Sequence, residues 1–257
     1  MKIGLALSGG GARGMSHLGV IKALEEFGLR FYEVSGTSAG AIAGAFYCYG
    51  YTPDETLSLI SQMGFLNSVR PAWAWAGLLS MDGFKEMMLR CMPENDFSAL
   101  KIPLTVAATE IRLGKIVYFN EGELVSSVIA SSSIPALFNP VQQKENFYVD
   151  GGIMDNLPVR PLVGKCDIII GSHCNPVQQR FDLGSVKDIT ERSLLIAINV
   201  NTTLSKTHCT HVIEPPDLGK FSTFDLAKGK EIFEIGYKYT KANYKAIDFQ
   251  INETLKH

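Results

Sequence analysis

Residues 36–40, Gly-Thr-Ser-Ala-Gly, place a serine between two glycines directly after the strand-like run 31–35. The small residues that follow, 39–45, favour a helix. The sequence therefore predicts a sharp strand-to-helix turn with Ser38 at its tip, near the positive end of the helix. Side chains on either glycine would crowd the strained backbone and the packing of the helix against a sheet. This pattern makes Ser38 a candidate nucleophile.

A second glycine-rich segment, residues 8–14, follows the apolar run Ile3 to Leu7, which is a predicted first strand. Its three consecutive glycines leave backbone N–H groups unshielded, at an entropy cost that a plain turn would not require. Donors that are fixed in place before reaction stabilise the oxyanion of a tetrahedral intermediate by about 3 kcal/mol each. The segment is therefore typical of an oxyanion loop.

The same glycines also fit a dinucleotide-binding pattern. Gly9, Gly11 and Gly14 match Gly-x-Gly-x-x-Gly, and Glu33 stands near the position of a ribose-binding acid. This fingerprint is weak without context, and a dinucleotide fold gives no reason for a serine turn at the end of the next strand. It is the less favoured interpretation.

The third motif is an aromatic and β-branched strand, residues 147–149, that ends in Asp150 and is followed by Gly151 and Gly152. Taken alone, Asp-Gly after a strand indicates a turn. With a serine turn and a glycine loop already present, Asp150 becomes the candidate partner of Ser38.

These three motifs, in this order, resemble the patatin-like phospholipase family over nearly the whole chain. Gly9 to Gly14 is similar to the family's oxyanion loop, Gly36 to Gly40 to its nucleophile turn, and Asp150-Gly151-Gly152 to its Asp-Gly-Gly/Ala motif. Ser8 departs from plant patatins, which carry aspartate there, whereas bacterial-type members often have serine. Three further segments are similar to the family: residues 130–138, 155–158 and 236–237.

The resemblance implies an α/β fold in three layers, a mainly parallel central sheet flanked by helices on both faces, and one domain over residues 1–257. The alternation of strand-like and helix-like segments is typical of such a sheet. Strands are expected at residues 3–7, 31–35, 104–108, 116–119, 147–150, 167–170 and 211–213. Helices are expected at residues 13–27, 39–50, 186–200 and 224–246, and another at Thr52-Pro53 with a capping box to Glu55.

The resemblance also implies a mechanism without metal or cofactor. Ser38 would attack the carbonyl of a lipid or other acyl ester, and Asp150 would accept its proton directly. Water would then hydrolyse the acyl-serine. The implied oxyanion hole is formed by the backbone of Gly10 and Gly11, with Gly9 and Ala12 as further candidates.

Arg13 follows this loop at the start of the next helix. It could hold a lipid phosphate or steady the loop, and a solvated arginine at a helix start is the alternative.

Three other functions share some of these motifs. An α/β-hydrolase would need a histidine after the acid, but none of His173, His208, His211 and His257 stands in a recognisable loop. His17 precedes the serine turn and is expected to pack or to hydrogen-bond locally. An acyltransferase would use the same acyl-serine, and a regulatory or binding protein could keep the dyad without turnover.

The composition of the chain limits its fold size, its partners and the state of its cysteines. The 257 residues, 46% apolar, suit one large α/β domain, and a net charge of −2 without a long basic stretch gives no reason to expect nucleic acid as a partner. Five cysteines without a Cys-x-x-Cys pair favour reduced thiols over disulfides or a metal site.

The N-terminal apolar run leads straight into the predicted oxyanion loop, which argues against a cleaved signal peptide. A cytoplasmic protein is expected, with peripheral contact at the inner membrane face. Residues 64–84 hold both tryptophans and are a candidate lid, with a buried core segment as the alternative. The lysines of 228–245 could contact anionic headgroups, but a solvated helix face is the favoured interpretation.

Overall fold

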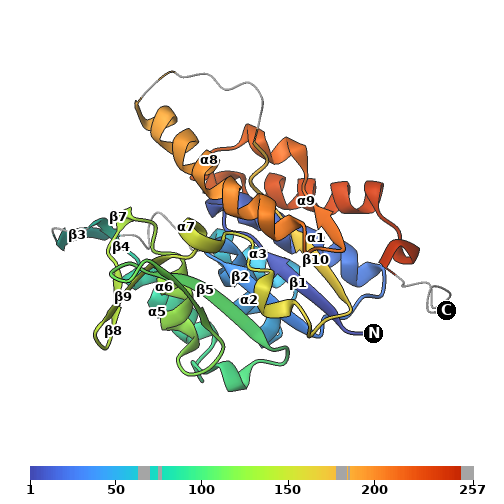
Figure 1. Ribbon diagram of the computed structural model, residues 1–257, viewed down its shortest axis with the longest axis horizontal. Helices are drawn as coiled ribbons and strands as arrows, with labels where there is room; N and C mark the ends of the chain where they lie inside the picture. The colour runs from blue at the N-terminus through green and yellow to red at the C-terminus, as the bar shows by residue number, and fades with distance from the viewer. Residues whose placement is uncertain (63–69, 75–76, 178–183, 185, 250–257) are drawn as a thin grey trace.

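The computed structural model describes residues 1–62, 70–74, 77–177, 184 and 186–249. Their main feature is a mixed sheet in the order β11-β10-β1-β2-β5-β9-β8, with β6 also paired to β5 (Figure 1). The parallel part consists of β1 (Ile3–Leu7), β2 (Glu33–Thr37), β5 (Leu104–Glu110), β10 (Ile168–Ser172) and β11 (His211–Ile213). The antiparallel part consists of β6 (Lys115–Phe119), β8 (Val141–Gln143) and β9 (Asn146–Asp150).

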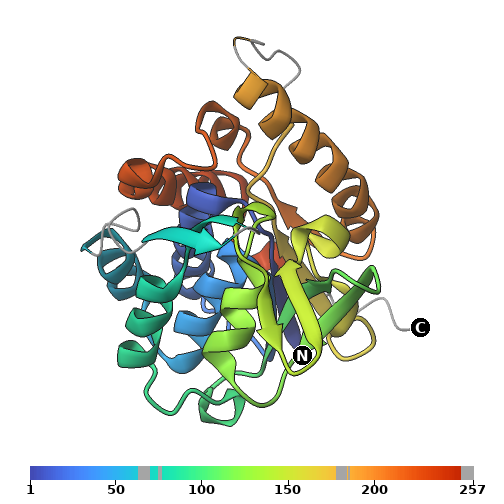
Figure 2. The same ribbon diagram turned by 90° about the vertical axis from the view of Figure 1, so that its left-hand side faces the viewer.

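Apolar residues on both faces of the sheet explain the layers. Leu5 and Leu7 belong to the main core, whereas Ala6 between them belongs to a smaller core with Leu157 and Leu162. Successive residues of a strand point to opposite faces, so a strand that is apolar throughout must be covered on both sides. The expected three-layer α/β fold is confirmed, with helices on both sides of the sheet (Figure 2).

The helices are α1 (Met15–Glu26), α2 (Ala39–Tyr49), α3 (Pro53–Gln62), α5 (Asp82–Cys91), α6 (Leu124–Ser131), α7 (Gly152–Asp155), α8 (Val186–Lys206) and α9 (Gly229–Asn243). The capping box is present, since the Glu55 carboxylate accepts from the Thr52 amide at 2.8 Å and the Thr52 hydroxyl accepts from the Glu55 amide at 3.2 Å. Helix α2 ends at Tyr49 and is capped by Gly50, whose φ of 118° suits glycine. These features agree with the expected helix boundaries.

Several other expected boundaries are wrong by a few residues. A 3-10 turn, Gly11–Gly14, precedes α1, because the glycine loop enters the helix through a tight turn. Strand β2 begins at Glu33 and not at Phe31, while α8 continues to Lys206. Helix α9 begins only at Gly229, after a short 3-10 turn, Leu226–Lys228.

Strand β5 changes its neighbour halfway along one edge. Thr37 of β2 pairs with Ala107, and Asp150 of β9 pairs with Ala108. Strand β6 pairs with β5 over both of these positions, so it occupies the other edge, and β2 and β9 follow each other along the same one. The exchange between Ala107 and Ala108 brings the end of β2 next to the end of β9.

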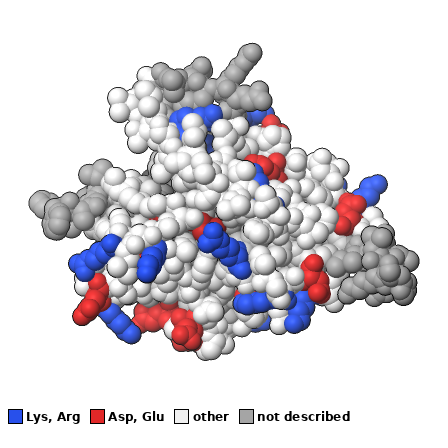
Figure 3. All heavy atoms as spheres, viewed as in Figure 1, with Lys and Arg blue, Asp and Glu red and all other residues white. Residues whose placement is uncertain are grey.

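A second small sheet is formed by β3 (Arg70–Ala74), β4 (Gly77–Ser80) and β7 (Ala136–Phe138). Within the candidate lid, residues 64–69 and 75–76 lie outside the described residues. None of the described helices is both long and apolar enough to cross a bilayer. On the face shown in Figure 3, basic and acidic side chains lie interspersed, not gathered by sign.

Candidate active site

Ser38 stands at the turn between β2 and α2 with φ 52° and ψ −121°, a strained conformation for a residue with a side chain. Two close approaches hold it there. A Cβ on Gly36 would lie 2.5 Å from the Gly40 carbonyl oxygen, and a Cβ on Gly40 would lie 2.2 Å from the Leu7 carbonyl oxygen. Both glycines are therefore required by packing, as the sequence predicts, and Ser38 is only 5% exposed.

Asp150 ends β9 and meets Ser38 because of the exchange of strands along β5. The Ser38 hydroxyl lies close enough to its carboxylate to lower the carboxylate pKa, and the Gly152 amide donates to Asp150 Oδ1 at 2.7 Å. Burial raises the pKa of Asp150 from 3.8 to about 6, although both of these groups oppose the rise. The carboxylate is thus a stronger base than a free aspartate while it remains ionised at neutral pH.

The two residues after Asp150 must be glycines, because neighbouring atoms leave no room for a side chain. A Cβ on Gly151 would lie 2.2 Å from the Ala107 carbonyl oxygen, and one on Gly152 would lie 3.0 Å from Asp150 Oδ1. The chain can leave β9 this close to β5 only without side chains. The Asp-Gly-Gly motif therefore sets the position of the carboxylate.

The four predicted oxyanion donors of the glycine loop fall into two pairs, which differ in whether their amides are already hydrogen-bonded. The Gly9 amide donates to the Asn156 carbonyl at 3.0 Å and the Ala12 amide to the Thr223 carbonyl at 2.8 Å. Both amides are engaged, so the expectation that they bind an oxyanion is wrong. The Gly10 and Gly11 amides donate to no group in the described part of the chain, and they remain the candidate donors.

The loop is closely packed on both sides. A Cβ on Gly10 would lie 2.3 Å from Cys174 Sγ, and one on Gly14 would lie 2.4 Å from the Ala39 Cβ. Gly11 has φ 56°, a left-handed conformation that favours glycine. The run of glycines thus follows from the close contacts of this loop with the segment after β10 on one side and with the nucleophile turn on the other.

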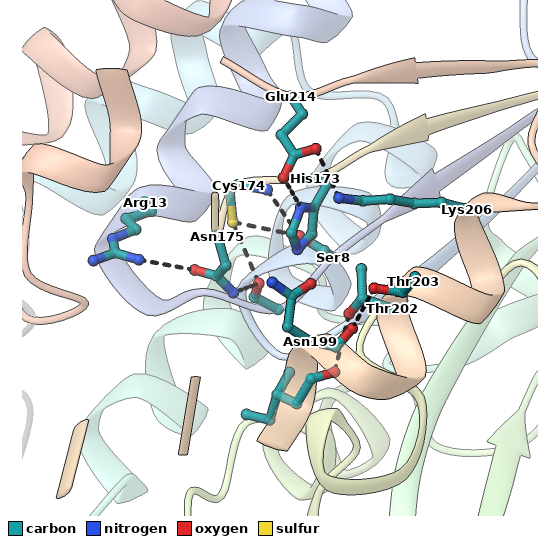
Figure 4. Close-up of polar contacts among 12 residues, drawn as sticks. Ser8, Arg13, His173, Cys174, Asn175, Asn199, Thr202, Thr203, Lys206 and Glu214 are labelled. Carbon is teal, nitrogen blue, oxygen red and sulfur yellow. Dashed lines mark hydrogen bonds and ion pairs between the residues drawn. The ribbon is translucent and has the colours of Figure 1, made fainter. Parts of the chain in front are cut away.

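Arg13 is buried, so the alternative of a solvated side chain is wrong. Its Nε donates to the Phe221 carbonyl at 2.8 Å, and Nη1 donates to Asn175 Oδ1 at 3.4 Å. Asn175 in turn donates to the Gly9 carbonyl at 2.7 Å (Figure 4). These contacts hold the glycine loop, and a lipid-phosphate role for Arg13 stays a prediction.

His17 lies behind the loop and does not reach Ser38. Burial lowers its pKa to about 4, so the ring is neutral at neutral pH. One ring nitrogen lies 2.8 Å from the Ser8 carbonyl, which can only accept, and the other lies 2.8 Å from Ser172 Oγ. Nε2 therefore donates to Ser8 and Nδ1 accepts from Ser172. The expected local hydrogen bonding of His17 is confirmed.

Sequence reasoning missed three polar residues of the site. Ser131 Oγ accepts from the Ser38 amide at 2.8 Å and donates to the Ala107 carbonyl at 2.6 Å, so it joins the nucleophile turn to β5. Asn175 holds Gly9, as described above. Asn201 of α8 donates to the Gly152 carbonyl at 3.1 Å. Ser131 lies in the family-like segment 130–138, whereas no motif marks Asn175 or Asn201.

An open, mainly apolar pocket of about 140 Å³ leads to Ser38. Its walls come from the glycine loop, α1, α2, α3, α5, the segment after α6 and the segment before α9. Its apolar lining residues include Met15, Leu18, Ile42, Ile60, Met81, Phe84, Ile134, Leu137, Phe138, Phe224 and Leu226. Such a lining fits a hydrocarbon chain.

The competing interpretations find little support in the geometry. Glu33 pairs with Gly4 at the start of β1, whereas the glycine loop follows the end of that strand, so Glu33 cannot complete a dinucleotide site. His173 is buried against Glu214 at 2.8 Å (Figure 4). Within the described residues, no group of three His, Cys, Asp or Glu side chains could hold a metal ion.

The family model for patatin-like phospholipases matches residues 5–163, a range that contains the glycine loop, the nucleophile turn and the Asp-Gly-Gly motif. The chain belongs to the patatin-like phospholipase family. This patatin-like chain is 32% identical over 177 residues to uncharacterised NTE family proteins of Mycobacterium bovis and Mycobacterium tuberculosis, covering 68% of its own length and 49% of theirs.

It is also 27% identical over 272 residues to the lysophospholipase NTE1 of Kluyveromyces lactis, with 92% of the chain and 19% of that protein covered. The patatin-like chain thus spans about half of the mycobacterial relatives and a fifth of the yeast one. Among solved structures, VipD of Legionella pneumophila matches with a TM-score of 0.55 at 15% identity, covering 94% of this chain and 66% of VipD. This likeness concerns the fold.

Proposed function

We propose that the protein is a serine hydrolase that cleaves carboxylic esters of phospholipids or related acyl lipids, with the catalytic unit extending over residues 1–257. The observation that carries this proposal is the strand arrangement that brings Ser38 beside a buried Asp150, whose pKa burial raises to about 6. The Gly10 and Gly11 amides, which have no hydrogen-bond partner among the described residues, lie on the loop beside this pair, and an apolar pocket leads to it. Each requirement of acyl transfer thus has a candidate group.

In the first step, Ser38 Oγ attacks the ester carbonyl while its proton passes to Asp150. The transfer is concerted with the attack, because even a pKa of about 6 lies far below that of a serine hydroxyl. The Gly10 and Gly11 amides bind the oxyanion. The tetrahedral intermediate collapses, the proton on Asp150 passes to the leaving alcohol, and an acyl-serine remains.

In the second step, water attacks the acyl-serine and gives a proton to Asp150. The bond between the acyl carbon and Ser38 Oγ then breaks, and the proton returns to Oγ. A carboxylic acid is released and the dyad is restored. Asp150 therefore acts as base and as acid in both steps, as microscopic reversibility requires.

The apolar pocket and the lysophospholipase name of the yeast relative support a lipid substrate. Such substrates lie in membranes or micelles, so we also propose peripheral membrane contact. Helix α8 supports it, because Val186, Ile189, Ile196, Val200 and Leu204 are exposed at helical spacing. Binding to anionic and neutral vesicles would test this contact.

The direct test uses a fluorophosphonate probe and a p-nitrophenyl ester on the wild type and Ser38→Ala. Both labelling and hydrolysis should be lost in the variant, the hydrolysis by about 10⁵-fold or more. Ser98→Ala is the matched control, because Ser98 is exposed in a 3-10 turn capped by Asp96 and does not line the pocket. Undiminished hydrolysis in Ser38→Ala would overturn the proposal. Product analysis with an added alcohol acceptor distinguishes hydrolysis from acyl transfer.

A further inference from the structure

Asn156 follows α7 and lies between the glycine loop and the Asp150 turn. Its Oδ1 would be 2.6 Å from a Cβ on Gly9 and 2.9 Å from a Cβ on Gly152. The Cβ position on Gly9 is 3.1 Å from the Ser38 Cβ, and the Cβ position on Gly152 is 3.0 Å from Asp150 Oδ1. The Asn156 carboxamide is therefore a close neighbour of both members of the dyad.

The backbone and the side chain of Asn156 have different roles. Its backbone N–H donates to Asn201 Oδ1 at 3.0 Å, and its carbonyl accepts the Gly9 amide at 3.0 Å. The side chain is 2% exposed, yet Nδ2 has no hydrogen-bond partner among the described residues. The backbone alone ties this turn to the glycine loop. A buried amide donor without a partner is costly, and it therefore calls for a ligand that the reaction supplies.

The second step of the proposed reaction needs such a group. The attacking water must sit within reach of Asp150, and a buried water is normally held by two to four polar partners. A carboxamide offers both an acceptor and donors, so it can orient a water whose proton is directed to Asp150. No charged group is added, so the pKa of the base is little disturbed.

We propose that the Asn156 carboxamide holds the hydrolytic water for deacylation, an inference that rests on the proposed serine hydrolase function. The water oxygen forms a bond to the acyl carbon and its proton passes to Asp150. The bond from the acyl carbon to Ser38 Oγ breaks, and the proton passes from Asp150 to Oγ. Asn156 exchanges no atoms or electrons, and acts by placing the nucleophile.

This role differs measurably from that of an oxyanion donor. A donor to the oxyanion acts in both steps, because each passes through a tetrahedral intermediate. A residue that holds the water acts only in the second step. A purely structural residue would lower the melting temperature and slow both steps together.

The experiment follows a p-nitrophenyl ester by stopped flow in the wild type, Asn156→Leu and Asn156→Ser. Leucine keeps the volume without polar atoms, and serine keeps one hydroxyl. We expect deacylation to slow by about 10- to 100-fold in Asn156→Leu, and by less in Asn156→Ser, with acylation within about threefold of wild type. The acyl-enzyme should accumulate and add the acyl mass to the intact protein.

Two controls separate the outcomes. Asn201→Ala removes the bonds to the Asn156 backbone and to the Gly152 and Ile153 carbonyls but keeps the Asn156 carboxamide, and Asn243→Ala alters an exposed amide whose described bond is to the Tyr239 carbonyl. Equal slowing of both steps in either Asn156 variant, or unchanged deacylation, would overturn the assignment. If one variant fails to fold, the other carries the test. Fluorophosphonate labelling that persists in Ser38→Ala would instead count against the serine mechanism itself.

Discussion

The wall of the site that carries the glycine loop is held by polar contacts, whereas the wall of the pocket is lined by aliphatic and aromatic side chains. On the first wall, Arg13, Asn175 and His17 each hydrogen-bond to backbone carbonyls of the loop or of segments beside it. On the second wall, side chains such as Ile42 and Leu137 meet the cavity through apolar contacts.

Hydrogen bonds are directional and fix the positions of the atoms they join, while apolar contacts mainly determine the volume that a side chain can occupy. A loop that must present two amides to an oxyanion needs the first kind, since small displacements weaken the stabilisation of the transition state. A chain-binding pocket needs only the second kind. Substitutions on the polar wall should therefore affect the rate with every substrate, and substitutions on the apolar wall should affect the choice of substrate.

The largest effect is expected for Asp150→Asn, which keeps the shape of the side chain and removes the base. Hydrolysis should fall by about 10⁴-fold for short and long esters alike. In the wild type, kcat/KM should fall as the pH drops below about 6, because protonation of Asp150 removes the base. Full activity of the variant would disprove the dyad, and a flat pH profile would disprove the raised pKa.

The same substitution should stabilise the fold at neutral pH. The pKa of Asp150 is higher in the folded protein than in the unfolded chain, so the folded state binds more protons between about pH 4 and 6 and loses stability as the pH rises through that window. Removing the charge should gain up to about 3 kcal/mol at pH 7 and almost nothing near pH 3. Urea unfolding of wild type and Asp150→Asn at both values measures the difference.

An intermediate effect is expected for Gly11→Ala, compared with Gly114→Ala. Both glycines have positive φ, 56° and 61°, so both variants carry backbone strain of about 1–2 kcal/mol. Only at Gly11 would the new Cβ meet another group, the Thr223 carbonyl oxygen at 2.2 Å. Turnover should fall by about 10²- to 10³-fold in Gly11→Ala and stay within twofold in Gly114→Ala. Similar turnover in the two variants would remove Gly11 from the oxyanion hole.

The smallest effect is expected for Ile42→Trp, which fills part of the apolar pocket. The ratio of kcat/KM for long over short acyl esters should fall by about tenfold, with the short ester within about twofold of wild type. Ile247→Trp, at a residue that is 60% exposed, is the matched control. A uniform loss over all chain lengths would show that this wall also positions the reacting groups, and the contrast between the two walls would then fail.

The sequence marked the candidate reacting residues better than the residues that support them. Ser38, Asp150 and the glycines stand in motifs because turns and close approaches restrict which residues fit there. Asn175 and Asn201 were not predictable, because a single asparagine gains its role only from strands and helices that lie far away in the chain. The engagement of the Gly9 and Ala12 amides has the same origin, since their partners are carbonyls at Asn156 and Thr223.

The exchange of neighbours along β5 has a consequence for assembly. Ser38 directly follows β2 and Asp150 ends β9, and each reaches the site only when its strand has paired with the same edge of β5. Contacts between distant segments of a chain form late in folding, because the loops that join them must first close. Enzymatic turnover should consequently recover during refolding only with the last phase of sheet formation. Recovered activity would then indicate that the whole sheet has paired correctly.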